Sequence, residues 1–246
     1  MKDNINTSNF NFFIYWEDKN NQKTPELVKK CIHIFKQKCK TLHIVNDDNI
    51  NDYIDTVSTK NIKHIAQKVD YYRAKLLYTY GGIWCDIDTI MLDSLDDEWD
   101  DFQRSGKEVC ISTTQLKSDI PSVCIAYLMA KKNSIVFKKW TEECEKMIKS
   151  KKHLKWAELG GFLLGKIVNQ NNFHDLIHPF PNNITYRYGW RNHLKYYNTD
   201  KDFIEKEKDK LKLHEYKMII LYGTYMYNKS IPVDTVLNMF LNYNHE

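Results

Sequence analysis

Two aspartates separated by one residue are the first feature of this sequence that could carry chemistry. Asp86 and Asp88 end an apolar stretch, YTYGGIWCDIDT, at residues 78–89. Alternate residues of a strand face the same way, so the two carboxylates would project together, with Cα atoms about 6–7 Å apart. Carboxylates this close repel each other unless a cation or hydrogen-bond donors compensate. The pair is typical of a hard divalent cation site, of a phosphatase nucleophile loop, or of a polar strand end.

A second pair of charged residues precedes the aspartates. Asp70 and Arg73 lie three residues apart in a stretch with helical periodicity, so they share one helix face. A planar guanidinium beside a carboxylate can form a structural ion pair, or it can hold sugar hydroxyls or a phosphate. Gly81 follows, where a helix end favours a left-handed residue. The helix would therefore carry this pair toward the end of the sheet that bears the aspartates.

Alternating strands and helices position these residues. Apolar and β-branched runs predict strands at residues 10–16, 41–46, 83–86, 109–112, 123–129 and 218–222. Periodic apolar positions predict helices at residues 58–80, 133–149, 157–168 and 232–241, and a first helix with Thr24 as N-cap and Pro25 at its first position. Val233 would face the core in the last helix, and residues 204–213 would be a solvated helix face. This order predicts an α/β domain with a largely parallel or mixed sheet.

Composition limits the partners of the chain. The 246 residues carry 36 basic and 32 acidic side chains with the signs interleaved, so no nucleic-acid partner is expected. No repeat or Gly/Ser/Pro-rich linker interrupts the sequence, which predicts a single domain over residues 1–246. No apolar stretch has the length of a signal peptide or a transmembrane helix, and the expected location is cytoplasmic. The six cysteines lack Cys-x-x-Cys spacing and are expected to be free thiols.

The region from the first charged pair to the second resembles a known family. Residues 70–88, DYYRAKLLYTYGGIWCDID, resemble the sugar-binding DxD region of glycosyltransferase family 32. The match includes the Asp, Arg, Leu, Tyr, Gly-Gly and both final Asp of that pattern. The family includes the yeast initiating α-1,6-mannosyltransferase, and its region recurs in capsular polysaccharide enzymes and in the catalytic domain of large clostridial glucosylating toxins.

The resemblance implies a fold, a reaction and roles for these residues. The fold would be GT-A, a Rossmann-like α/β/α sandwich with a mixed, mostly parallel central sheet. Asp88 would bind Mn²⁺ or Mg²⁺, while Asp86 would hold ribose or sugar hydroxyls and reach the metal through water. Asp70 and Arg73 would bind the sugar of a nucleotide-sugar donor. A hexose or N-acetylhexosamine would pass, with retention of configuration, from a UDP-sugar, or less favourably from GDP-mannose, to a glycan, lipid-linked or protein acceptor.

Weaker similarity extends toward both ends of the chain. Residues 13–16, FIYW, resemble the family's opening strand, and Trp16 matches the aromatic residue that stacks on the nucleotide base. The glycines in ELGG, at residues 158–161, fall where relatives open a helix. In YGTYMYNKS, at residues 222–230, Asn228 or Ser230 could complete the metal and diphosphate site. The sequence departs from the family there, since Tyr225 stands at the apparent His position and Ile-Pro replaces a Trp.

Two other classes of protein stay open. Asp86-Ile-Asp88-Thr89 also fits the nucleophile motif of haloacid-dehalogenase-like phosphatases, in which the first Asp attacks phosphorus. Such an enzyme needs a later acidic pair for Mg²⁺, but the last predicted strand is followed by GTYMYN, which has no carboxylate. Thr89 is then expected to be a turn residue. The altered C-terminal segment also fits a catalytically inactive sugar-nucleotide or glycan-binding protein, although the intact charged pairs favour the transferase.

Overall fold

The structure is a computed structural model that describes residues 10–18, 23–60, 62–113, 115–150, 153–155, 157–185, 187–188, 190–212, 215–221 and 229–243. The chain divides into two units by its internal contacts. The first unit contains Met1–Glu17, His43–Cys85 and Glu98–Phe180, and the second contains Asp18–Leu42, Asp86–Asp97 and Pro181–Glu246. Neither unit is a contiguous stretch of sequence. A single catalytic domain over residues 1–246 therefore stays a prediction.

A six-stranded sheet in the order β2-β1-β3-β6-β5-β7 organises the first unit. Its strands are β1 (Phe12–Tyr15), β2 (Leu42–Val45), β3 (Gly82–Cys85), β5 (Val109–Cys110), β6 (Tyr127–Ala130) and β7 (Ile177–His178). β1 is parallel to β3 and β5 is parallel to β7, whereas β6 is antiparallel to both of its neighbours. β1, β3, β5 and β7 therefore run in one direction, and the predicted mixed sheet is confirmed.

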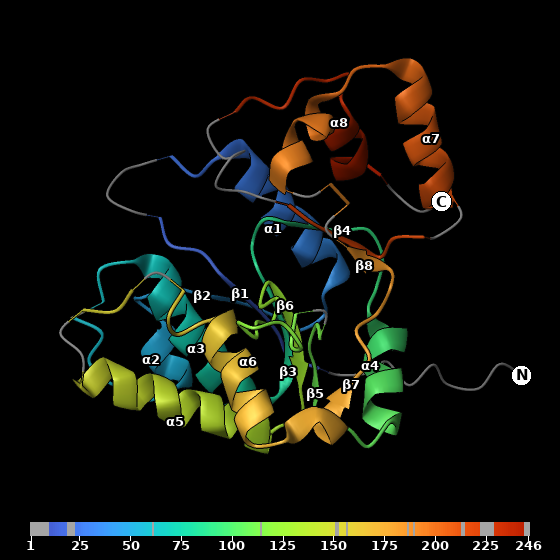
Figure 1. Cartoon of the computed structure of the whole chain (residues 1–246). Coiled ribbons are helices and arrows are strands. Elements are labelled where there is room, and N and C mark those ends of the chain that lie inside the picture. Colours follow the sequence, from blue (N-terminus) through green and yellow to red (C-terminus); the bar gives the residue numbers. More distant parts are fainter. Residues whose placement is uncertain are drawn as a thin grey trace, which may run out of the picture. The chain divides into compact units, whose positions relative to one another are not determined.

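Helices pack on this sheet and enclose its core. They are α2 (Ile50–Tyr53), α3 (Ile65–Tyr80), α5 (Ile135–Ser150) and α6 (Gly161–Gln170), with a short 3-10 helix η1 (Phe173–Leu176) and with α4 (Asp96–Arg104), which begins in the second unit. α3, α5 and α6 lie together beside the sheet (Figure 1). Phe13 and Trp84 from the strands pack with Leu76 of α3 and Phe137 of α5 in one buried cluster. Apolar side chains thus fix α3 against the sheet.

Two glycines join α3 to β3. Gly81 ends α3 with a φ of +66°, and Gly82 follows with a φ of +104°, both in the region that favours glycine. A Cβ on Gly82 would lie 2.2 Å from the carbonyl oxygen of Asn11, which accepts a hydrogen bond from the amide of Ile83 at 2.8 Å. The Gly-Gly break therefore ends the helix, as predicted, and also lets the chain approach the residue before β1.

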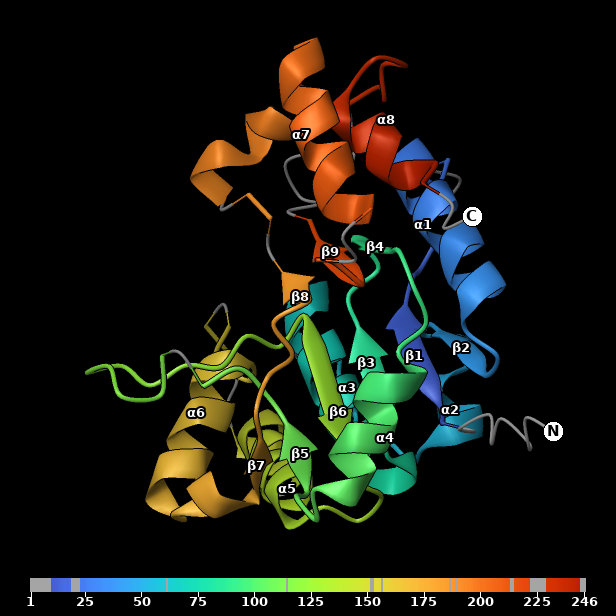
Figure 2. The same cartoon turned by 90° about the vertical axis from the view of Figure 1, so that its right-hand side faces the viewer.

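A three-stranded sheet in the order β4-β9-β8 lies in the second unit. Its strands are β4 (Thr89–Met91), β8 (Ile184–Thr185) and β9 (Met218–Ile220). The helices of this unit are α1 (Glu26–Lys38), α7 (Lys201–Lys212), α8 (Val236–Leu241) and the 3-10 helix η2 (Trp190–Tyr197). β9 is antiparallel to β4 and parallel to β8. α1 buries Leu27, Cys31 and Phe35, which recur every four residues. α1 packs on β4 and α8, and α7 also packs on α8 (Figure 2).

Several predicted helix starts are wrong. α3 begins at Ile65 and not at residue 58, because the preceding residues form a turn in which the amide of Ile62 donates to the carbonyl of Thr59. α6 begins at Gly161 and not at residue 157, because Ala157 has a positive φ of +60°. α8 begins after its N-cap Thr235, so Val233 lies before the helix and is 78% exposed.

The ends of α1, α7 and β6 also differ from the predictions. Pro25 and not Thr24 is the N-cap of α1, and the Thr24 hydroxyl instead donates to the carboxylate of Asp18. α7 is more than a solvated face, because Glu207 and Leu211 are buried on one side of it. β6 begins at Tyr127 and not at residue 123, since the backbone there bonds to the start of α6 and not to a strand.

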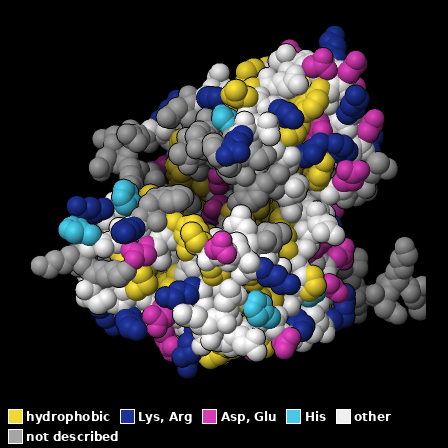
Figure 3. All heavy atoms as spheres, viewed as in Figure 1, with side chains coloured by type: hydrophobic (Ala, Val, Ile, Leu, Met, Phe, Trp, Pro, Cys, Tyr) yellow, Lys and Arg dark blue, Asp and Glu magenta, His cyan; other side chains and the backbone are white. Residues whose placement is uncertain are grey.

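Surface and thiol properties agree with the composition. All six cysteines are free and five of them are buried, as predicted. In the described part of the chain, no helix is long and apolar enough to cross a membrane. On the face drawn in Figure 3, Lys and Arg side chains are interleaved with Asp and Glu side chains. This face offers no broad patch of one charge.

Candidate active site

Asp86 and Asp88 lie in a bend immediately before β4, in the second unit. Both are half-buried, whereas Ile87 between them is 6% exposed. β3 ends at Cys85, so the prediction that Asp86 belongs to a strand is wrong by one residue. The predicted turn residue Thr89 is instead the fully buried first residue of β4. The bend therefore leaves the two acidic positions accessible and buries the residues around them.

The backbone of Asp88 is tied to β9. The amide of Leu221 donates to the carbonyl oxygen of Asp88 at 2.8 Å, and the β4–β9 pairing begins with Thr89 opposite Ile220. The chain therefore leaves β9 from a position bonded to Asp88. Residues 222–230 follow directly in the sequence; Asn228 and Tyr225 lie outside the described residues, and Ser230 is exposed.

The donor atoms at the bend fit a hard divalent cation. Carboxylate oxygens such as those of Asp86 and Asp88 are the ligands that Mg²⁺ and Mn²⁺ prefer. Burial, and then the negative charge of Asp88, raises the pKa of the Cys31 thiol on α1, so this soft ligand stays protonated. Among the described residues, no three His, Cys, Asp or Glu side chains form a complete metal site. The two aspartates would need a further ligand from water, from a diphosphate or from residues 222–230.

Asp70 and Arg73 form a buried ion pair on α3, in the first unit. Nη2 of Arg73 lies 3.2 Å from Oδ1 of Asp70, and the two residues are 5% and 4% exposed. Nη1 of Arg73 donates to the carbonyl oxygen of Ile125 at 2.5 Å, and the guanidinium carbon lies 4.9 Å from the ring centre of Trp84. The predicted shared helix face is confirmed, and it is turned toward the core of the unit.

The start of α6 comes close to Asp70. Gly160 is the N-cap of α6, and a Cβ on it would lie 2.6 Å from Oδ2 of Asp70. A Cβ on Gly161 would lie 2.1 Å from the carbonyl oxygen of Val123. Amide groups at a helix N-terminus carry a positive partial charge that favours a nearby carboxylate. The Gly-Gly pair, which was predicted to open a helix, therefore allows α6 to begin beside Asp70.

Trp16 directly follows β1 in the first unit and is half-buried. Its amide donates to the carbonyl oxygen of Val45 at 3.0 Å, which fixes the end of β1 beside the end of β2. The indole is therefore attached to a rigid strand end. An aromatic ring in such a position can stack on a flat nucleotide base, because every base has a π-face.

A cluster of polar side chains that sequence reasoning missed lies at the same strand ends. The Tyr15 hydroxyl lies 2.9 Å from Oε2 of Glu17 and 3.0 Å from Oδ1 of Asp47. Lys68 of α3 forms ion pairs with Asp47 and, at 3.9 Å, with Glu17. Burial, and then the hydrogen bond to Glu17, raises the pKa of Tyr15 far above its usual value, so the hydroxyl stays a donor.

A signal for this cluster was present in the sequence. Glu17 and Asp47 each come two residues after the last residue of a strand. Ligands of open α/β sheets bind beyond the carboxyl ends of strands, where polar residues tend to gather. Lys68 could not be found in this way, because its place depends on how α3 packs against β1 and β2. Tyr15 and Glu17 of this cluster flank Trp16 in the sequence. The cluster therefore adds two carboxylates and one ammonium group to the candidate site.

Comparison with known sequences finds relatives over much of the chain. The sequence model of the capsular polysaccharide synthesis protein family matches residues 1–156. The O-glycosyltransferase PaGT of Phomopsis amygdali is 27% identical over 77 residues, which are 30% of this chain and 19% of PaGT. The match thus spans about a fifth of the length of that relative.

Comparison with solved structures identifies the fold. Mouse xyloside xylosyltransferase 1, in its apo form, has a TM-score of 0.51 and 9% identity over 87% of this chain and 98% of that chain. The PaToxG glycosyltransferase has a TM-score of 0.45 and 12% identity over 84% of this chain and 76% of that chain. The likeness to the mouse enzyme confirms the predicted GT-A fold.

The match to the family model also shows the family to which the chain belongs. This family model matches residues 1–156 of 246, which is more than half of the sequence, and this part includes both charged pairs and Trp16. The predicted assignment to a glycosyltransferase family is therefore confirmed. The chain belongs to the capsular polysaccharide synthesis protein family.

Proposed function

We propose that the chain is a metal-dependent, retaining glycosyltransferase that moves a hexose or N-acetylhexosamine from a nucleotide sugar to a hydroxyl acceptor. The donor is a UDP-sugar in preference to GDP-mannose, and the acceptor is a glycan, a lipid-linked molecule or a protein. The observation that carries the proposal is the half-buried pair Asp86 and Asp88, tied to β9 through the Asp88 carbonyl, in a chain of this family. Residues 1–246 would act as one catalytic domain in the cytoplasm.

The bend before β4 would hold the cation and the diphosphate. Asp88 would bind the ion directly and Asp86 through water, and Asn228 or Ser230 would supply a further oxygen. When bound, Mn²⁺ or Mg²⁺ neutralises the charge that develops on the leaving nucleoside diphosphate, which lowers the barrier to transfer. The backbone hydrogen bond from Leu221 to Asp88 supports this role, because it fixes the backbone from which the carboxylate extends.

Residues of the first unit would bind the organic parts of the donor. The Asp70 carboxylate would accept hydrogen bonds from sugar hydroxyls, and Arg73 would hold that carboxylate in a fixed orientation. Trp16 would stack on the base, and Glu17 or Asp47 would accept hydrogen bonds from the nucleoside. The short contacts of Tyr15 and Lys68 support this assignment, because they hold both carboxylates in place before any ligand binds.

A donor screen tests the proposal. The chain is incubated with UDP- and GDP-sugars with and without Mn²⁺, and release of free nucleotide is measured in the absence of an acceptor. A transferase leaks some donor to water, so we expect metal-dependent release from one UDP-sugar. Binding without release would indicate a protein that protects its ligand. Hydrolysis of p-nitrophenyl phosphate in place of any sugar nucleotide would indicate a phosphatase.

A further inference from the structure

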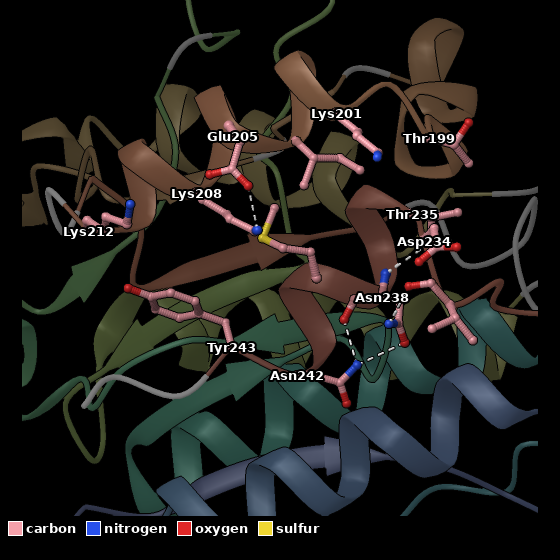
Figure 4. Close-up of a pocket in the computed structure, with 13 residues that line it drawn as sticks. Thr199, Lys201, Glu205, Lys208, Lys212, Asp234, Thr235, Asn238, Asn242 and Tyr243 are labelled. Atoms are coloured by element: carbon pink, nitrogen blue, oxygen red, sulfur yellow. Dashed lines mark hydrogen bonds and ion pairs between the residues drawn. The ribbon is translucent and has the colours of Figure 1, made fainter.

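A groove between α7 and α8 in the second unit lies outside the residues assigned to the donor. Its volume is about 1030 Å³, at the upper end of the ~300–1,000 Å³ usual for ligand sites. The labelled residues extend from Thr199 and Asp234 at one end to Lys212 and Tyr243 at the other (Figure 4). The groove is therefore elongated along the two helices, a shape that suits a chain-like ligand.

Lysines along α7 make one wall of the groove basic. Lys201, Lys208 and Lys212 all line it, and they span the 12 residues of α7. The first and last of them are about 16 Å apart along the axis at a rise of about 1.5 Å per residue. Lys201 has no ion-pair partner within the described residues, whereas Nζ of Lys208 lies 2.6 Å from Oε1 of Glu205. Spaced positive charges along a groove favour a ligand that carries separated negative charges and not one compact anion.

Amide side chains of α8 and of its C-cap make the opposite wall. Nδ2 of Asn242 donates to Oδ1 of Asn238 at 2.8 Å, and Nδ2 of Asn238 donates to the carbonyl oxygen of Val233 at 2.7 Å. These bonds fix both amides in orientation. Each amide has two N–H donors and an oxygen with two lone pairs, so each keeps hydrogen-bonding capacity for a ligand. Fixed amides of this kind suit neighbouring hydroxyl groups that both donate and accept.

Apolar atoms make up more of the groove's lining surface than polar atoms do and lie between its polar walls. Ile204 from α7 and Met239 from α8 line it, and Tyr243 stands at one end. A sugar ring presents C–H groups on its faces and hydroxyls at its edges, so it can contact apolar and aromatic side chains while its hydroxyls bond to amides. A lipid or an apolar peptide would leave most of the lining lysine, amide and carboxylate groups without partners.

We propose that the α7–α8 groove binds an acidic oligosaccharide, a sugar chain that bears uronate carboxylates. The amides of Asn238 and Asn242 would bond to hydroxyls, and Lys201 and Lys208 would pair with successive carboxylates. Glu205 and Asp234 also line the groove, and these carboxylates disfavour the closely spaced phosphates of a nucleic acid. The proposal goes beyond transfer itself, because the groove would hold a sugar chain whether or not Asp86 and Asp88 act on a donor.

The test titrates the full chain, without metal or nucleotide sugar, with acidic hexasaccharides of hyaluronan, polymannuronate and polygalacturonate, and with neutral maltohexaose. Heteronuclear NMR follows the side-chain amide signals. We expect at least one acidic chain to bind at concentrations up to about 5 mM and to shift the amide signals of Asn238 and Asn242. Maltohexaose should bind at least about fivefold more weakly. Because no donor is present, failure of the transferase proposal would leave this result unaffected.

Charge reversals on α7 locate the site. Lys201→Glu combined with Lys208→Glu should weaken binding at least about tenfold. Lys206→Glu is the matched control, because Lys206 is exposed on the same helix but does not line the groove, and it should change affinity by less than about twofold. The proposal is overturned if none of the acidic chains binds, if maltohexaose binds equally well, or if Lys206→Glu weakens binding as much as the double variant.

Discussion

Each unit of the molecule contains a buried carboxylate that pairs with an arginine, and the two pairs differ in how the arginine is used. In the second unit, Nε and Nη2 of Arg187 donate to the two oxygens of Glu207 at 2.7 and 2.5 Å. The guanidinium also lies over the rings of Tyr188 and Tyr216, and Lys210 is 3.3 Å from the same carboxylate. In the first unit, Arg73 divides its guanidinium between Oδ1 of Asp70 and a backbone carbonyl.

The difference shows that burial alone does not mark a ligand site. Glu207 is 1% exposed and Asp70 is 4% exposed, so the exposure of the carboxylate does not separate the two pairs. The surrounding backbone does separate the two pairs. Residue 160 is a glycine, and any Cβ there would collide with the Asp70 carboxylate. We interpret the Arg187–Glu207 pair as structural and the Asp70–Arg73 pair as part of the donor site. Three variants and one change of pH test this distinction.

The largest effect on stability is expected at the structural pair. Arg187→Ala leaves the Glu207 carboxylate buried without its main partner, so the free energy of unfolding should fall by about 3–5 kcal/mol in urea denaturation. Lys208→Ala on the same helix breaks an exposed pair and should cost less than about 0.5 kcal/mol. If both variants lost a similarly small part of the free energy of unfolding, the structural role of Arg187 would be contradicted.

The next effect concerns catalysis at the other pair. Asp70→Asn keeps the size of the side chain but weakens its hydrogen bonds to a sugar, so kcat/KM for the donor should fall about 100-fold, or about 2.7 kcal/mol. Glu145→Gln is the control, because Glu145 on α5 accepts hydrogen bonds from Lys75 and Tyr71 of the same helix α3. It should lower stability and leave kcat/KM within about twofold. Equal kcat/KM in both variants would contradict the proposed role of Asp70.

Trp16 tests whether the first unit binds the base. Trp16→Ala should weaken nucleotide affinity about tenfold, since stacking of a base on an aromatic ring is worth roughly 1–3 kcal/mol. Trp16→Phe keeps a ring and should retain affinity within about threefold. Calorimetric titration with UDP measures both variants. An unaltered affinity in Trp16→Ala would exclude this residue from the site.

Acid should weaken the structural pair in a defined pH range. Burial alone would raise the pKa of Glu207, but the hydrogen bonds from Arg187 outweigh it and lower this pKa. A carboxylate whose pKa falls on folding stabilises the protein above its unfolded pKa of about 4.3, and this contribution is lost as the pH falls through the folded value. Each unit of depression is worth about 1.4 kcal/mol. At pH values below about 4.3, the free energy of unfolding should therefore decrease with falling pH less steeply in Glu207→Gln than in the wild-type chain.

Local sequence patterns predicted the elements that depend on interactions between residues close in the sequence. The apolar runs at β1, β2 and β9 and the glycine stop after α3 all lie where the sequence places them. Errors occur where a specific hydrogen bond, local or distant in sequence, decides the outcome. The start of α3 is shortened by a turn, and Glu207 of α7 is buried because Arg187 is there to pair with it. Neither contact is visible in hydrophobic periodicity.

The candidate site divides in the same way. Asp70, Arg73, Asp86, Asp88 and Trp16 follow from family resemblance, because their spacing is a property of one continuous stretch or of a strand end. The cluster of Tyr15, Glu17, Asp47 and Lys68 joins three segments of the chain and depends on their packing. The groove between α7 and α8 depends on how these two helices pack. In the sequence they are two separate stretches, and their packing cannot be read from either one.

The most direct measurement is metal-dependent release of nucleotide from the donor by wild-type chain, Asp88→Ala and Asp119→Ala. Asp119 is an exposed aspartate between β5 and β6 and serves as the matched control. We predict Mn²⁺-dependent release by the wild-type chain and by Asp119→Ala, and background release by Asp88→Ala with an unchanged unfolding temperature. Undiminished, Mn²⁺-dependent release by a folded Asp88→Ala variant would contradict the assignment of Asp88 to the metal and with it the proposed site.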